Sequence, residues 1–209
     1  MHRKRHTRSG PVVVALLLAG LLTWPTAALA QLATASTVTG QATVVQATVL
    51  GLLGTATTTT LASTAPLAST TDAQDASQLT GSVPALLSAG TLSAATIGYP
   101  DQVDSVASLG SLSMNLVGVS ISADLVMAQA TQVLGAAASG SSSLDNLVVN
   151  GIPIAISGAP NQTVSIPGGQ MVINEQTVSS TGAFVVNALH VTVNGVANLV
   201  LASATAGIS

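Results

Sequence analysis

The sequence predicts an all-β fold, mainly antiparallel, built as a two-sheet sandwich or roll. Runs rich in Val, Ile, Leu and Thr recur from Gln41 onward and are separated by Gly, Asn and Pro, which is typical of strands. Apolar and polar residues alternate between positions 106 and 127, as the side chains of a strand do. Three pairs of such runs flank short turn sequences. A β-solenoid is the alternative, although no repeat of fixed period with a shared motif occurs.

The first part of the domain is expected to alternate extended runs with polar connections. The expected elements are a lead-in at 31–40, a strand at 43–50, a threonine run at 57–60 that forms a strand or its edge, a long polar loop or one short helix at 63–82, an extended run at 84–97, a turn at 98–101, and a small-residue loop at 136–143.

The alternation in the middle of the chain changes its phase once. Apolar residues from Val106 to Leu116 fall on even positions, and those from Val119 to Met127 fall on odd positions. Because side chains of a strand alternate with period two, this change predicts a tight turn or bulge near Val117-Gly118.

The last third of the chain contains three hairpin signals. Two use Asn-Gly, which suits a type I′ turn because both central residues need positive φ. Pro153 lacks an amide hydrogen, so its strand is expected at a sheet edge. The expected hairpins join 146–149 to 152–156 across Asn150-Gly151, 163–166 to 171–173 across Pro167-Gly168-Gly169, and 184–193 to 196–202 across Asn194-Gly195.

The first thirty residues have the layout of a cleavable secretory signal. Four basic residues in 1–10 precede an uncharged apolar run at 11–24, and the small residues Ala28 and Ala30 follow, as a signal peptidase requires. The apolar run is shorter than the roughly 20 residues of a membrane-spanning helix. We therefore expect a signal-peptide helix at 1–30, the lead-in at 31–40, one all-β domain at 41–209, and no membrane span after cleavage.

Cleavage would remove every cationic Lys and Arg. The remaining chain carries seven Asp and Glu and no Lys or Arg, so its side-chain charge is −7 with His190 neutral. Phosphate backbones and anionic lipids are bound through Lys and Arg, which excludes nucleic acid as a partner. The chain has no Cys, so neither disulfides nor a lipidated cysteine are available.

Glu175 and His190 form the one pair of residues suited to acid–base chemistry. One interpretation is a carboxylate that orients an imidazole, and the other is a hydrogen-bonded pair that joins two strands. We expect Glu175 at a strand end on the parity of Met171 and Ile173, and His190 in mid-strand on the parity of Phe184 and Val186.

Other chemistry has less support in the sequence. No Gly-x-Ser-x-Gly motif is present, and a zinc site needs several His or Cys ligands. Asp72 with Asp75, and Asp101 with Asp104, could each contribute to a calcium site, which takes six to eight oxygens. Solvated loop carboxylates explain both pairs more simply, so we predict no metal and no cofactor.

Four stretches of the C-terminal half carry a family resemblance. They are Val149-Asn150-Gly151, residues 158–163 (GAPNQT), residues 172–176 (VINEQ) and residues 186–193 (VNALHVTV). With them, the chain resembles the bacterial choice-of-anchor P proteins. The resemblance implies an exported surface or extracellular domain and no established reaction. The residues of its motifs, for which we expect structural roles, are Asn174, Glu175, Gln176, Asn187 and His190.

Together these features predict a protein that acts outside the cell membrane, secreted or associated with the cell surface. The expected role is structural or interactive, without evident catalysis. The alternatives are an extracellular hydrolase that uses Glu175 and His190, and a calcium-stabilised adhesin module. The molecular partner is not identified by the sequence. Self-association and contact with the cell envelope fit the low charge and high β-propensity.

Export with cleavage makes a first prediction. The protein recovered from an expressing bacterium should begin at Gln31, because Ala28 and Ala30 present small side chains to the peptidase. Intact-mass measurement and N-terminal sequencing check this. A chain that retains residues 1–30 after export would contradict the cleavage site and favour an uncleaved anchor.

Overall fold

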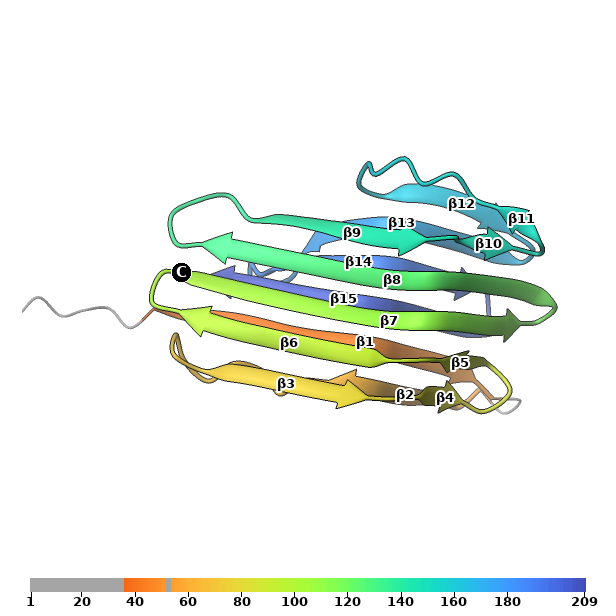
Figure 1. Ribbon diagram of the computed structural model, residues 1–209, viewed down its shortest axis with the longest axis horizontal. Helices are drawn as coiled ribbons and strands as arrows, with labels where there is room; N and C mark the ends of the chain where they lie inside the picture. The colour runs from red at the N-terminus through yellow and green to blue at the C-terminus, as the bar shows by residue number, and fades with distance from the viewer. Residues whose placement is uncertain (1–35, 52–53) are drawn as a thin grey trace, which may run out of the picture. The chain divides into compact units, whose positions relative to one another are not determined.

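The structure is a computed structural model that describes residues 36–51 and 54–209. Each regular element in these residues is a β-strand (Figure 1), which confirms the all-β prediction. The signal segment 1–30, with its expected helix and cleavage residues, lies outside the described residues. Within the described part, no helix is long and apolar enough to span a membrane.

The strands fill most of the described chain. In chain order they are β1 Val38–Leu50, β2 Ala56–Ser63, β3 Ala73–Gln78, β4 Gly81–Val83, β5 Leu87–Ala89, β6 Leu92–Tyr99, β7 Gln102–Leu116, β8 Val119–Val133, β9 Ser139–Asp145, β10 Val148–Val149, β11 Ile152–Pro153, β12 Gln162–Ile166, β13 Gly169–Val178, β14 Phe184–Val193 and β15 Ala197–Ile208.

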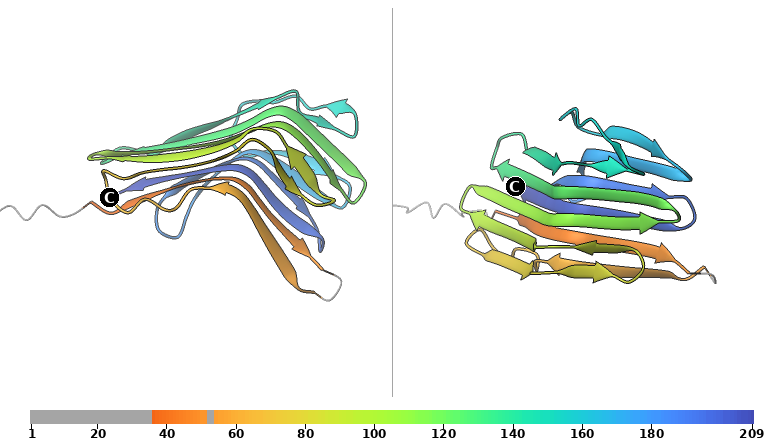
Figure 2. Two further views of the ribbon diagram at one scale, coloured as in Figure 1. Left: turned by 60° about the horizontal axis from the view of Figure 1, so that its bottom comes forward. Right: turned by 45° about the vertical axis from the view of Figure 1, so that its right-hand side comes forward.

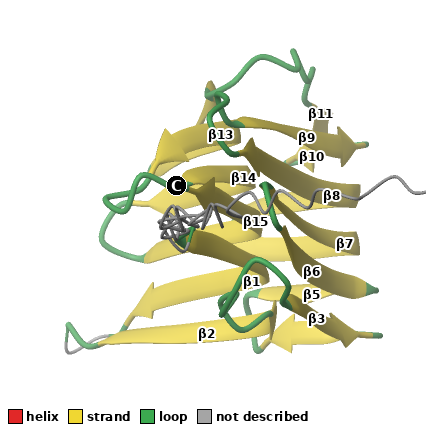
Figure 3. Cartoon of the chain, turned by 90° about the vertical axis from the view of Figure 1, so that its left-hand side faces the viewer, coloured by secondary structure: helices red, strands yellow, loops and turns green. Residues whose placement is uncertain are grey.

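These strands form two antiparallel sheets. The six-stranded sheet has the order β12-β13-β14-β15-β1-β2. The nine-stranded sheet is built on the long hairpin β7–β8. β6 pairs with the first part of β7 and is followed by β3, while β5 pairs with the last part of β7 and is followed by β4. On the other side, β8 pairs with β9 and with β10, which is followed by β11. The sheets pack face to face, with β15 and β1 over β7, β8 and β6 (Figure 3). This arrangement confirms the two-sheet sandwich and rules out the solenoid, which stacks parallel coils.

The three expected hairpins are present, although Gly169, expected in a turn, is the first residue of β13 and pairs with Ile166. Asn150 (φ 49°) and Gly151 (φ 79°) both have positive φ, so the β10–β11 turn is type I′ as predicted. The β14–β15 turn is different. Only Gly195 has positive φ, and the Val196 N–H donates to the Val193 carbonyl at 3.0 Å. That geometry is a type II turn, so the type I′ prediction is wrong there.

Several boundaries differ from the sequence-based expectation. β1 begins at Val38, inside the segment taken as a lead-in, because it pairs with β15 as far as Ile208. Residues 63–82 contain β3 and the start of β4 rather than one long loop or a short helix. The run expected at 84–97 is divided into β5 and β6, and β9 begins inside 136–143. Pro153 lies in β11 at the end of the nine-stranded sheet, as its missing amide hydrogen requires.

A row of irregular residues crosses both sheets, and the strands bend there (Figure 2). At these positions one residue of each strand is missing from the ladder of cross-strand pairs. In every second strand this unpaired residue has positive φ. We call this row the break line. It comprises Ala62, Val44, Ala202, Ala188 and Asn174 in the six-stranded sheet, and Ser111, Asp124 and Asn146 in the nine-stranded sheet.

Each strand turns its other face inward where it crosses the break line. Leu201 and Ala202 are consecutive yet both buried, and so are Ala188 and Leu189. The turn at Val117-Gly118 is confirmed. The expected alternation is correct only between the break line and this turn. In β7 the core side carries odd positions up to Leu109 rather than even ones, and in β8 it carries even positions from Val126 rather than Leu125 and Met127.

The break line separates two halves of the core that differ in side-chain size. On the side of the chain's C-terminus the inward residues are mostly small: Gly40, Ala42, Ala94, Thr96, Ser105, Ala107, Ala128, Ala130, Ala204 and Ala206. On the other side they are mostly large, although Ala47, Ala123 and Ala197 are buried there too: Leu112, Met114, Ile121, Met171, Ile173, Leu189, Leu199 and Leu201. The two halves therefore need different spacings between the sheets.

Hydrogen bonds between the sheets show how closely the small-residue half is packed. The Ser105 hydroxyl donates to the Thr205 carbonyl of the opposite sheet at 2.6 Å, and Thr96 Oγ1 lies 2.7 Å from Ser105 Oγ. A serine side chain cannot reach across the ~10 Å that usually separates packed sheets. The close approach depends on Gly40, where an added Cβ would lie 2.6 Å from Thr96 Oγ1.

Removal of the Ser105 hydroxyl should destabilise the fold measurably. Ser105→Ala leaves the buried Thr96 hydroxyl without this partner, so we expect a loss of about 1–3 kcal/mol in the free energy of unfolding. Ser108→Ala is the matched control, because Ser108 lies on the outer face of the same strand, and should stay within about 0.5 kcal/mol. Urea unfolding measures both. Equal effects would contradict the bridging role of Ser105.

Candidate functional site

The break line determines which way the candidate acid–base pair faces. The parity expected for Glu175 and His190 would have placed both on the core side of their strands. Because β13 turns at Asn174 (φ 52°) and β14 at Ala188, both side chains lie on the outer face instead. Glu175 is also inside β13, which continues to Val178, so the expected strand end is wrong.

Glu175 and His190 are in direct contact across β13 and β14. The Nδ1 atom of His190 lies 3.0 Å from Oε1 and 2.9 Å from Oε2 of Glu175. The side chains are 22% (His190) and 19% (Glu175) exposed. A carboxylate only accepts hydrogen bonds, so the Nδ1 atom carries a proton and donates it.

Two asparagines extend this pair along the sheet. The Asn187 amide donates to Glu175 Oε2 at 2.6 Å, and Asn198 Oδ1 lies 2.9 Å from His190 Nε2. The resulting chain of polar side chains runs from β13 through β14 to β15. Asn187 Oδ1 is buried without a partner among the described residues. The Asn187 side chain therefore hydrogen-bonds only through its NH₂ group, to Glu175.

The contacts of the imidazole limit its chemistry. Nδ1 is bound by Glu175 and Nε2 by Asn198, whose amide can present either its oxygen or, after a flip, its NH₂ group. His190 is thus satisfied in its neutral and in its doubly protonated form. A general base needs a nitrogen within hydrogen-bond reach of a substrate proton, and here each ring nitrogen already has a partner within the sheet.

Asn174 and Gln176 fix the strand around this pair. Asn174 is buried and its amide donates to the Gly158 carbonyl at 3.2 Å. The Gln176 amide donates to Asn174 Oδ1 at 3.0 Å and to the Gly140 carbonyl of the opposite sheet at 3.1 Å. Asparagine tolerates positive φ better than most residues, which suits Asn174 to the break line.

The carboxylates are divided unequally between the sheets. Glu175 is the one acid in the six-stranded sheet. Five Asp residues lie in the nine-stranded sheet or its turns, and Asp72 lies in the connection that leads into β3. Asp72 accepts hydrogen bonds from the Ala68 backbone at 2.9 Å and from the Gln74 amide at 2.9 and 3.1 Å. The hydrogen bond from the Ala68 N–H first, and then the one from the Gln74 amide, lowers the pKa of the Asp72 carboxyl from its usual value.

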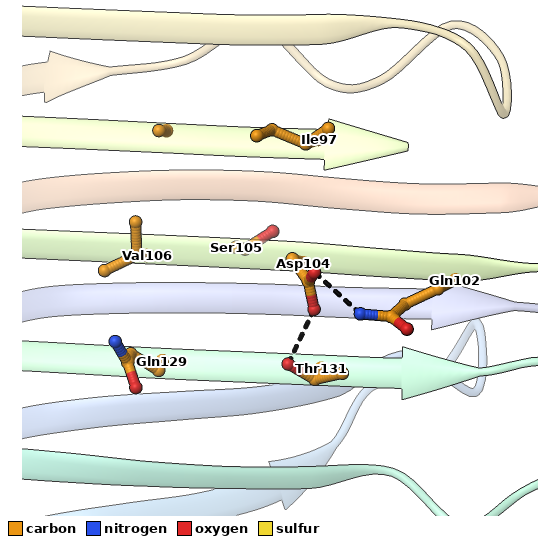
Figure 4. Close-up of a pocket in the computed structure, with 8 residues that line it drawn as sticks. Ile97, Gln102, Asp104, Ser105, Val106, Gln129 and Thr131 are labelled. Carbon is orange, nitrogen blue, oxygen red and sulfur yellow. Dashed lines mark hydrogen bonds between the residues drawn. The ribbon is translucent and has the colours of Figure 1, made fainter. Parts of the chain in front are cut away.

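A hollow of about 420 Å³ on β6, β7 and β8 contains the carboxylate of Asp104 (Figure 4). Thr131 donates to Asp104 Oδ1 and Gln102 to Oδ2, both at 2.7 Å. These two donors already satisfy both carboxylate oxygens. Ile97 and Val106 add apolar surface to the same hollow. The hollow thus contains a single hydrogen-bonded carboxylate and neither a histidine nor a second acid.

The described residues hold no group of three or more His, Cys, Asp or Glu able to bind a metal ion. In the expected calcium pairs, Asp72 and Asp104 each accept hydrogen bonds from neighbouring donors, while Asp75 and Asp101 are exposed. A second hollow, of about 290 Å³, borders Asn198 next to Thr48 and Thr192.

Comparison with protein-family models, with curated proteins and with solved structures finds no match. Among the site residues, sequence reasoning missed Asn198. The expected hairpin across Asn194-Gly195 would have paired Thr192 with Ala197 and placed Asn198 on the other face. The structure shifts this register by one residue and pairs Thr192 with Asn198, which brings Asn198 to the face of His190.

The contact between Glu175 and His190 should stabilise the sheet modestly. In a double-mutant cycle with Glu175→Ala and His190→Ala, we expect a coupling energy of roughly 0.5–1 kcal/mol, the range of partly exposed ion pairs. Glu175→Ala combined with Gln46→Ala on β1 is the control and should be additive. Chemical denaturation of the four variants measures each cycle. A coupling of zero for the first pair would show that the contact contributes nothing to stability.

Proposed function

We propose that this chain is an exported bacterial domain with a structural or interaction role outside the cell membrane. The observation that carries the proposal is the use of His190: both ring nitrogens are bound to residues of the same sheet. The one conspicuous acid–base pair thus serves to join β13, β14 and β15. The signal-like residues 1–30 support export.

Composition supports this role physically. The described chain has no Lys, Arg or Cys, so apart from the contact of Glu175 with His190 its stability comes from apolar burial and hydrogen bonds. Salt screens such a structure little. A fold with these properties is suited to an environment whose ionic strength and redox state vary.

The resemblance to the choice-of-anchor P proteins supports the same location. Its motif residues Asn174, Gln176 and Asn187 all bind neighbouring strands or loops. We propose membership of that family on these residues, and with it an association with the cell surface or the surrounding medium.

Export can be tested with a single cysteine in a chain that has none. Thr163 is exposed on β12, so Thr163→Cys should react with a membrane-impermeant maleimide in the medium or on intact cells. The same variant without residues 1–30 is the control, and should react only after lysis. If the full-length variant also needs lysis, the proposed location is wrong.

The non-enzymatic part of the proposal has its own test. The purified protein is assayed for hydrolysis of polysaccharide and peptide substrates beside His190→Ala. We expect no turnover that depends on His190. An activity lost in His190→Ala, with an unchanged melting temperature, would overturn this part and favour a hydrolase.

A further inference from the structure

Among the described residues, β2 is the longest sheet edge without an evident protection against pairing with another strand. An edge strand presents unpaired N–H and C=O groups, which folded proteins usually protect by short length, proline, charge or cover. β2 has eight residues and no charge or proline, and it pairs only with β1 (Figure 3).

The other edge of the six-stranded sheet is protected. β12 has five residues and Pro167 follows it. Its first residue, Gln162, accepts from the Ser157 N–H at 2.7 Å and donates to the Ala155 carbonyl at 2.7 Å. Residues 155–157 are thereby held against the start of the strand.

The edges of the nine-stranded sheet are protected as well. β3 carries the exposed carboxylate of Asp75, and β4 has three residues before Pro84. β11 has two residues, one of them Pro153. In β9 the Gly140 carbonyl already accepts a bond from Gln176.

The side chains of β2 favour pairing with an identical strand. Thr57, Thr58 and Thr60 are exposed, so both faces of this part of the strand are open to solvent. Threonine has high β-propensity, and Thr58 already forms a cross-strand hydroxyl contact of 2.9 Å with Thr48. Threonines opposite each other across two strands form such contacts readily.

We infer that two copies of this chain associate through antiparallel pairing of their β2 strands, which joins the two six-stranded sheets edge to edge. With a twofold axis perpendicular to the sheet, even-numbered residues of one β2 strand pair with even-numbered residues of the other. Thr58 and Thr60 of both copies therefore lie on the same, outer face. This contact is isologous and closes at two copies. The dimer does not depend on the proposed export of the protein.

Electrostatics make the dimer sensitive to salt. Each copy carries an excess of carboxylates and no Lys or Arg in the described part, so the copies repel each other at long range. Salt screens this repulsion, and the dissociation constant should therefore fall as salt is added.

Light scattering and sedimentation of the purified chain test the pairing. We expect a dimer, and Thr60→Lys should raise the dissociation constant roughly tenfold or more, since like charges on directly paired strands oppose pairing. Thr163→Lys is the matched control, because it makes the same change in net charge at the other edge of the sheet. Thr163 is exposed and lies at the far end of the row of paired residues that begins at Thr60. This variant should leave the dimer intact.

Mixing provides a second measurement. Thr60→Glu alone should also weaken the dimer, and an equal mixture of Thr60→Lys and Thr60→Glu should restore association as a heterodimer. Unfolding curves confirm that both variants are folded. A monomeric wild-type chain at high concentration and high salt would overturn the inference. So would an open-ended assembly, or an equal loss of the dimer in Thr60→Lys and Thr163→Lys.

Discussion

The break line is the constraint on which the rest of this structure depends. Where the strands cross it, each one reverses its inward face, and several residues there adopt positive φ without being glycine, among them Ala62, Ser111 and Ala202. This conformation costs a residue with a Cβ roughly 1–2 kcal/mol, so the surrounding packing must hold it in place. What it permits is a sandwich with two spacings: serine and alanine pack closely on one side, and leucine, isoleucine and methionine fill the wider space on the other.

The candidate site is a consequence of the same constraint. On an uninterrupted strand, Glu175 would share the core side of Ile173, and His190 that of Val186. A buried carboxylate and imidazole would both need compensation for the loss of solvent. The reversal at Asn174 and Ala188 brings both to the outer face, where Asn187 and Asn198 complete their hydrogen bonds. The pair therefore stabilises three strands of the sheet beside the break line, rather than facing into a cavity.

Much of the fold could be predicted from local sequence, because turns and edges depend on individual residues. Asn150-Gly151 has the backbone freedom that a type I′ turn needs, and Pro153 can only occupy an edge. The break line could not be predicted in this way. Ala202 and Ser111 are ordinary strand residues, and nothing local indicates positive φ. Their conformation comes from the neighbouring strands, which break at the same level. An alternation extended back through Ser111 assigns the wrong face to the residues of β7 that precede it, and the same error at Asn174 misplaced Glu175.

The absence of Lys and Arg from the described chain shapes its surface as well as its charge. Lysine is a common protection of edge strands, and this chain has to use other means. It uses short strands and prolines at β4 and β11, a carboxylate at β3, and side-chain amides at β9 and β12. Carboxylates can protect edge strands only in the nine-stranded sheet. In the six-stranded sheet Glu175 is bound to His190, and the other residues carry no acid. The uncharged edge at β2 thus follows from the same uneven distribution of acids that leaves the outer face of that sheet almost neutral.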